Sequence, residues 1–165
     1  MLRLAAFASI ATFALVPACR YSFEDDFAPD ADMGNISPSC MEATTRSDLA
    51  FIEEKVFATS CIFSGCHNGG NDDAGMMDLR AGASHAVLVG KPSKLFPSAN
   101  LVVAGAPNQS YLMMMVKHFT PEQMSPPVDP PPLDIGFMPQ NAGGASICVQ
   151  KREAIERWIT AGAMP

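Results

Sequence analysis

The most informative segment of this chain is Cys61-Ile62-Phe63-Ser64-Gly65-Cys66-His67-Asn68-Gly69-Gly70. It places two thiols close together, with an imidazole directly after the second. Thiols spaced in this way form a disulfide, bind a metal or attach a haem covalently. A disulfide has no use for the adjacent imidazole, so His67 favours a haem. Because exported thiols tend to oxidise before they find zinc, a Cys/His zinc site is the weakest of the three alternatives.

Covalent haem attachment requires two thiols that add to the two vinyl groups and an imidazole that reaches the iron. The usual spacing leaves two residues between the cysteines, and this chain has four. On a straight helix, positions five apart point about 140° from each other, whereas positions three apart differ by about 60°. A regular helix therefore cannot direct both thiols to the same haem. Gly65 is expected to adopt a conformation that lets the two extra residues bulge out.

The N-terminus has the layout of a bacterial secretory signal. Residues 2–16 are apolar, carry one early cation, Arg3, and are too short for a comfortable membrane span. The run ends in V-P-A-C, which resembles a lipobox, so we predict a signal peptide over 1–18 and lipidation of Cys19. Cleavage after Ala18 without a lipid is the alternative. Either way, we expect an exported protein of the periplasm or cell envelope, an oxidising setting in which disulfides form.

The charge of the chain excludes one class of partner. Its formal net charge is −6, and removal of residues 1–18 leaves 10 basic against 17 acidic side chains, or −7. An acidic surface repels phosphate, so nucleic acid is excluded as a partner. Residues 19–46 are acidic and rich in turn formers, and we expect them to form a disordered tether.

A helix is predicted to begin the folded domain, which we place at 47–163. Ser47 is its expected N-cap, and Leu49, Ile52 and Val56 form one apolar face that leads into the cysteines.

A second helix is predicted over 150–161, with Ile155, Trp158 and Ile159 on one side and Gly162 as C-cap. Both helices are amphipathic, and we expect them to cross with Trp158 between them.

The middle of the chain has few regular signals. One further helix is predicted over 109–118, where Met113, Met114 and Met115 are expected to fill an irregular apolar pocket. The prolines between 126 and 132 form a stiff segment that is incompatible with a helix interior. The sequence thus predicts a mainly α fold with long irregular loops.

Residues 47–163 resemble the small cytochrome c domains of exported bacterial proteins, including versions with the longer cysteine spacing. The resemblance implies a cytochrome c-like fold and one haem c per chain, attached through Cys61 and Cys66. The blocks that carry it are V-F-A-T-S-C-I-F-S-G-C-H-N-G-G at 56–70, M-D-L-R-A-G at 77–82, V-V-A-G-A-P-N-Q-S-Y-L at 102–112, F-M-P-Q at 137–140 and I-E-R-W-I-T-A-G-A at 155–163. The chain departs from the family in its cysteine spacing and at Ala104 and Ala106.

The resemblance also implies the iron ligands, with His67 proximal and Met138 distal. A thioether suits an electron carrier, because soft sulfur favours the reduced iron. Met124 is the alternative distal ligand, since it also lies shortly before a proline. His85 and His118 are isolated histidines and are expected to be ordinary surface or core residues.

Cys40 and Cys148 remain once the haem pair is assigned, and we expect them to form a disulfide in an oxidising compartment. The four cysteines after Cys19 allow three pairings, and a Cys61–Cys66 disulfide would instead give a haem-free binding module.

The sequence therefore predicts an electron-transfer protein and not an enzyme, since a six-coordinate haem has no open position for substrate. An acidic surface favours a basic redox partner through salt-sensitive contacts, and a lipid on Cys19 would add a membrane anchor.

Overall fold

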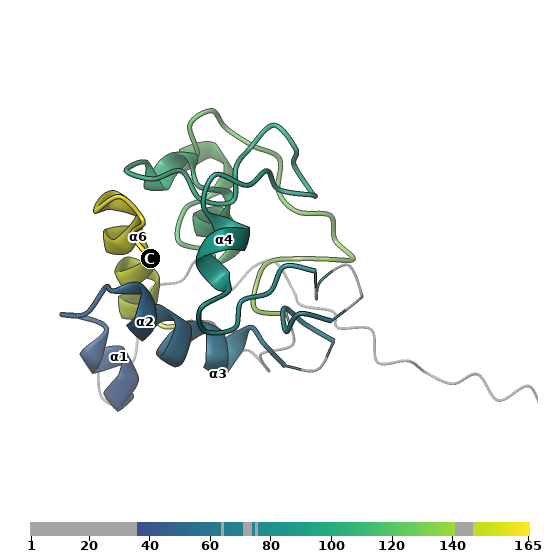
Figure 1. Ribbon diagram of the computed structural model, residues 1–165. Coiled ribbons are helices and arrows are strands. Elements are labelled where there is room, and N and C mark those ends of the chain that lie inside the picture. Colours follow the sequence, from purple (N-terminus) through teal and green to yellow (C-terminus); the bar gives the residue numbers. More distant parts are fainter. Residues whose placement is uncertain (1–35, 64, 71–73, 75, 141–146) are drawn as a thin grey trace, which may run out of the picture.

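The computed structural model describes residues 36–63, 65–70, 74, 76–140 and 147–165 (Figure 1). This part of the chain is mainly helical, which confirms the predicted class, and it contains two isolated β-bridges, Val89 with Val102 and Pro92 with Asn100. None of its helices is long and apolar enough to cross a membrane. The predicted signal peptide 1–18 and Cys19 lie outside the described residues.

The first long helix consists of α2 (Leu49–Ile52), η1 (Glu53–Phe57) and α3 (Ala58–Ser60) in direct succession. It begins one residue later than predicted. The N-cap is Asp48, whose Oδ1 accepts a hydrogen bond from the Phe51 N–H at 3.0 Å. Ser47 is not the cap because the capping side chain must reach the third helical N–H, and Asp48 occupies the position from which it does so.

The η1 segment is a turn of π-helix, in which the Ala58 N–H donates to the carbonyl of Glu53. Glu53 is buried, and its Oε1 accepts hydrogen bonds from the Gly82 N–H at 3.0 Å and the Ser84 hydroxyl at 2.6 Å. Ser84 begins α4 (Ser84–Leu88). This buried carboxylate therefore fixes the first helix to the start of α4.

The C-terminal helix α6 (Val149–Thr160) is the element that connects the others. It agrees with the predicted range to within one residue and is followed by Gly162 at φ +102°. It contacts α2, α5 (Tyr111–Met115), η2 (Pro107–Gln109) and α1 (Pro38–Glu42). The predicted contact between the N- and C-terminal helices is confirmed.

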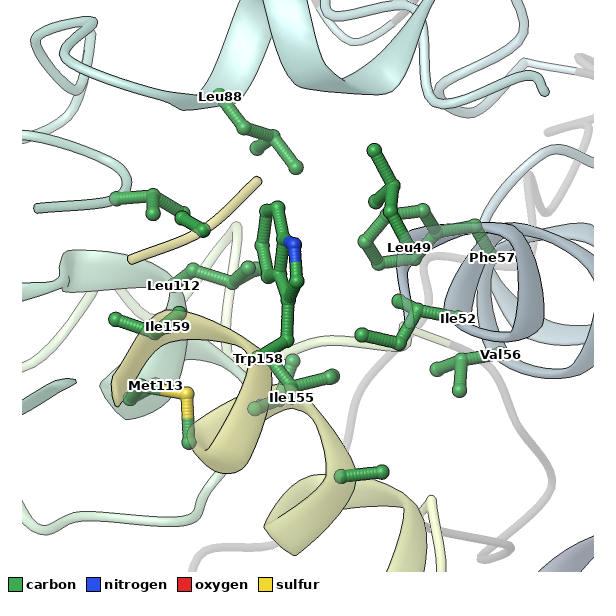
Figure 2. Close-up of a cluster of buried hydrophobic side chains, with 14 of the residues drawn as sticks. Leu49, Ile52, Val56, Phe57, Leu88, Leu112, Met113, Ile155, Trp158 and Ile159 are labelled. Atoms are coloured by element: carbon green, nitrogen blue, oxygen red, sulfur yellow. The ribbon is translucent and has the colours of Figure 1, made fainter. Parts of the chain in front are cut away.

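Trp158 lies at the centre of that contact (Figure 2). Its side chain is buried among Leu49, Leu88 and Ile155, and its Nε1–H donates to the carbonyl of Met164 at 2.7 Å. A buried aromatic side chain removes about 150–250 Å² from water, or roughly 4–6 kcal/mol of apolar burial as an upper estimate. Trp158 therefore holds the two helices together, as predicted.

The prediction of a disordered tether is wrong for residues 36–46. These residues include α1, in which Cys40 is buried and forms a disulfide with Cys148, the pairing expected from the sequence. Ala43 is fully buried, and Arg157 donates to its carbonyl. The acidic composition was misleading because the cross-link and α6 provide the burial that such a segment lacks alone.

The central helix α5 is shorter than the predicted 109–118. It ends before Lys117, which adopts φ +59°, a left-handed conformation that does not continue a right-handed helix. The following residues include a short 3-10 helix, η3 (Pro121–Gln123), and the proline-rich segment 126–132 is not helical, as predicted.

The domain also continues past residue 163, the predicted end, because the Met164 carbonyl accepts the hydrogen bond from Trp158.

The capping geometry gives a direct test. Asp48→Ala should lower the free energy of unfolding by about 1 kcal/mol, the usual cost of losing an N-cap side chain. Ser47→Ala is the matched control and should change it by less than about 0.5 kcal/mol. Urea denaturation followed by circular dichroism measures both. Equal losses in the two variants would contradict the assignment of Asp48 as the cap.

Candidate functional site

A large cavity among the described residues has a volume of about 710 Å³. Small-molecule and cofactor sites typically occupy about 300–1,000 Å³ and are mostly apolar. One part of its apolar wall comes from the end of the first helix and from residues 76–79. The other parts come from α4 and Leu101, from α5, and from the segment around Met138. The main apolar lining residues are Phe57, Met76, Met77, Leu79, Val87, Leu95, Leu101, Leu112, Met115, Val116, Ile135 and Ile147.

His67 lines this cavity and is itself buried. Its ring Nδ1 lies 2.8 Å from the carbonyl oxygen of Ala74, so Nδ1 carries the proton and donates it. This tautomer leaves the lone pair on Nε2, as a metal-ligating histidine requires. Its backbone is held on both sides, by its N–H to the Cys61 carbonyl at 3.0 Å and by the Leu79 N–H to its own carbonyl at 2.9 Å.

Cys61 lines the same cavity, at the end of α3. Burial, with a smaller contribution from the nearby Cys66 thiol, raises the pKa of Cys61 to about 12. At neutral pH Cys61 is therefore a protonated thiol that packs like a small apolar side chain. Such a thiol reacts slowly by itself, because the thiolate is the nucleophile.

Cys66 is half-buried and is not part of the cavity wall. Both Cys61 and Cys66 are free thiols in the structure, in contrast to the bonded pair Cys40 and Cys148. Between them Gly65 adopts φ +77°, the special conformation expected from the sequence, and a Cβ there would meet no atom within 4 Å. The segment before His67 thus has space in which to adjust.

Met138 lines the cavity from a third part of the sequence. Its N–H donates to the carbonyl of Met115 at 2.7 Å, which fixes this segment against α5. Met124, the alternative, is buried and lines a separate cavity of about 180 Å³ together with Pro126 and Val128. The structure therefore brings Met138, and not Met124, to the cavity that holds Cys61 and His67.

The other two histidines do not line this cavity. Nε2 of His85 lies 3.0 Å from the carbonyl oxygen of Ala163, and Nε2 of His118 lies 2.7 Å from Oε2 of Glu156. Both side chains make structural links to α6 or to the residues after it, which agrees with the ordinary roles expected for isolated histidines.

The residues around the cavity suit a haem better than a zinc ion. Among the residues that the structure describes, no three His, Cys, Asp or Glu side chains gather as a metal site would require. A thiol, an imidazole and a thioether instead line one apolar cavity of cofactor size. This donor set fits a haem c, for which Cys61, Cys66, His67 and Met138 are the residues that would hold the group.

The sequence analysis missed several polar residues at the cavity. Lys91 and Lys94 line it, as does Asp134. A signal was present, because K-P-S-K at 91–94 places two cations close together in an acidic chain. It also missed Ala74, whose carbonyl orients the His67 ring and which no sequence pattern marks.

No family model, curated protein or solved structure matches this chain. A functional assignment therefore depends on the cavity and on the residues that line it.

Proposed function

We propose that this protein transfers electrons and carries one covalently bound haem c in the large cavity. One observation carries the proposal: Cys61 and His67, which are close together in the sequence, line the same apolar space as Met138, which is distant from both. When bound, the haem supplies an iron centre that accepts and releases one electron. We also propose that the chain has a cytochrome c-like fold, which the contact between its terminal helices supports.

The role of His67 in this proposal is proximal ligation. The hydrogen bond from Nδ1 to the Ala74 carbonyl orients the ring and increases the basicity of Nε2. The two backbone hydrogen bonds of His67 keep the imidazole at a fixed place relative to Cys61. Such preorganisation lowers the cost of placing a ligand at a metal.

The role of Cys61 and Cys66 is to hold the porphyrin through thioether bonds. Cys61 already lines the cavity, whereas the Cys66 side chain must turn toward it. Gly65 provides the backbone freedom for this movement. Because the Cys61 thiol is protonated at neutral pH, we expect attachment to need a cellular haem-ligation system.

The role of Met138 is distal ligation by its thioether sulfur. Leu79, Leu112 and Val116 give the cavity an apolar lining. A thioether ligand and an apolar surrounding both favour the reduced iron, which is the property of an electron carrier. If His67 and Met138 both held the iron, no position would remain for a substrate, so we propose no enzymatic activity. For its redox partner we propose a protein with a basic face, matching the acidic net charge.

Covalent haem attachment is the first test. The mature protein, expressed with a cytochrome maturation system, should show a pyridine haemochrome spectrum and a covalent haem in its intact mass. Cys61→Ala with Cys66→Ala should remove the covalent haem, whereas Cys40→Ala with Cys148→Ala should retain it. Colourless protein with Cys61 joined to Cys66 would overturn the proposal and support a haem-free, disulfide-stabilised binding module.

The identity of the distal ligand is the second test. In the haem-loaded protein, Met138→Ala should lower the reduction potential by on the order of 0.1 V, within the ~0.8 V range that axial ligands control. It should also remove the sulfur-to-iron absorption band. Met124→Ala is the matched control, because Met124 lines the separate cavity, and it should leave the band in place. The reverse pattern would move the assignment to Met124.

Membrane anchoring through Cys19 is a separate proposal, motivated by the V-P-A-C sequence. Cys19→Ser should release the protein from the membrane fraction, because a diacylglycerol on Cys19 would be the only lipid attachment in the proposal. Immunoblots of soluble and membrane fractions measure this. Unchanged fractionation of the variant would contradict a lipid anchor and would favour cleavage after Ala18 alone.

A further inference from the structure

We propose that Lys117 is a positioning residue for Met138 at the large cavity. Its backbone conformation leaves the Met115 carbonyl available to Met138, and its side chain covers the ring of Phe137, the neighbour of Met138. The role of Met138 as an iron ligand rests on the proposed function, whereas these contacts belong to the chain itself. They can therefore be measured whether or not haem is bound.

The turn after α5 has the hydrogen bonds of a Schellman motif, in which a helix ends at a left-handed residue. The Lys117 N–H donates to the Met114 carbonyl and the His118 N–H donates to the Met113 carbonyl, each at 2.9 Å. Glycine usually occupies the left-handed position, because other side chains are strained there. Here the position holds a lysine at φ +59°. A strained residue of this kind points to a role for its side chain.

The turn also determines which group the Met115 carbonyl binds. In a helix that continued, this carbonyl would accept a hydrogen bond from the Phe119 N–H, four residues later. After the left-handed turn, the Phe119 N–H donates to the Met113 carbonyl instead, at 3.4 Å. The Met115 carbonyl accepts from the Met138 N–H at 2.7 Å. The end of α5 at Lys117 thus provides the acceptor that fixes Met138 beside α5.

The Lys117 side chain adds a second contact to the same segment. It is buried, and its Nζ lies 5.7 Å from the centroid of the Phe137 ring. An ammonium group at this distance is attracted to the face of an aromatic ring, and more strongly where water is excluded. Phe137 is itself buried in a cluster that includes Tyr111 and Met115. The backbone and the side chain of Lys117 therefore act on two adjacent residues, Met138 and Phe137.

α6 holds this turn in place with Arg152 and Glu156, which lie four residues apart on one face of the helix. Arg152 is buried, and its Nη1 donates to the Lys117 carbonyl at 2.5 Å. Nε2 of His118 lies 2.7 Å from Oε2 of Glu156. A guanidinium donor and a carboxylate acceptor thus stabilise the strained backbone on both sides of its carbonyl. Lys117 therefore links α6 to Met138.

Amide hydrogen exchange is the first measurement, made by NMR on the mature protein in the form in which it is isolated, with any haem kept reduced. Lys117→Gly keeps the left-handed turn, which glycine favours, and removes the side chain. The exchange rate of the Met138 N–H relative to that of Gly105 should rise about tenfold, as expected for a buried cation–π contact. The Gly105 N–H donates to the Ile159 carbonyl of α6 at 2.8 Å, so it reports general loosening.

Further variants assign the effect to the contact with the ring. Lys117→Arg restores a cation and should return the ratio of the two exchange rates to near its wild-type value. Phe137→Leu should raise the ratio by itself, and the addition of Lys117→Gly should then have little further effect. Arg46→Met is the matched control, because it removes a cation 5.0 Å from the centroid of the Phe51 ring, and it should leave the ratio unchanged.

In the haem-loaded protein, Lys117→Gly should weaken the sulfur-to-iron absorption band, and Lys117→Arg should restore it. Equal acceleration at Met138 and Gly105, no acceleration at Met138, or a band of unchanged strength would overturn positioning by Lys117 and leave the haem proposal intact. A full effect of Lys117→Gly in the Phe137→Leu background would overturn the ring contact. Wild-type protein that attaches no haem would overturn the haem proposal, while the exchange ratio would still decide whether Lys117 positions Met138.

Discussion

The burial of Trp158 between the first helix and α6 is the contact on which the rest of the structure depends. Few elements of this protein are long, so most segments gain stability by packing and not by their own helical propensity. α6 provides the surface against which α1, α2, η2 and α5 all pack. Because α5 is held there, its other side chains, including Leu112 and Met115, form one wall of the cavity.

The sequence was most informative where a pattern depends on local chemistry. The apolar spacing around Ile155 and Trp158 predicted α6 to within one residue, since burial of one helical face leaves a clear period. The adjacent Cys66 and His67 drew attention to His67, which lines the large cavity. Met138 lines the large cavity and Met124 lines a separate one, whereas the assignment of either as an iron ligand stays a prediction.

Other features depend on partners distant in sequence and were not predictable. The composition around Cys40 indicates disorder, yet the disulfide to Cys148 and contacts with α6 order this segment. The early end of α5 coincides with the left-handed conformation of Lys117. The buried Glu53 carboxylate is satisfied by Gly82 and Ser84, which no local pattern connects to it.

The disulfide between Cys40 and Cys148 encloses every residue that lines the large cavity, from Phe57 to Ile147. The cavity walls therefore belong to a covalent ring of the chain. A protease that cuts one exposed loop within that ring opens it without releasing a fragment, since both pieces stay linked through the two sulfurs. A single cut would thus leave the residues that line the cofactor-sized cavity within one covalent assembly.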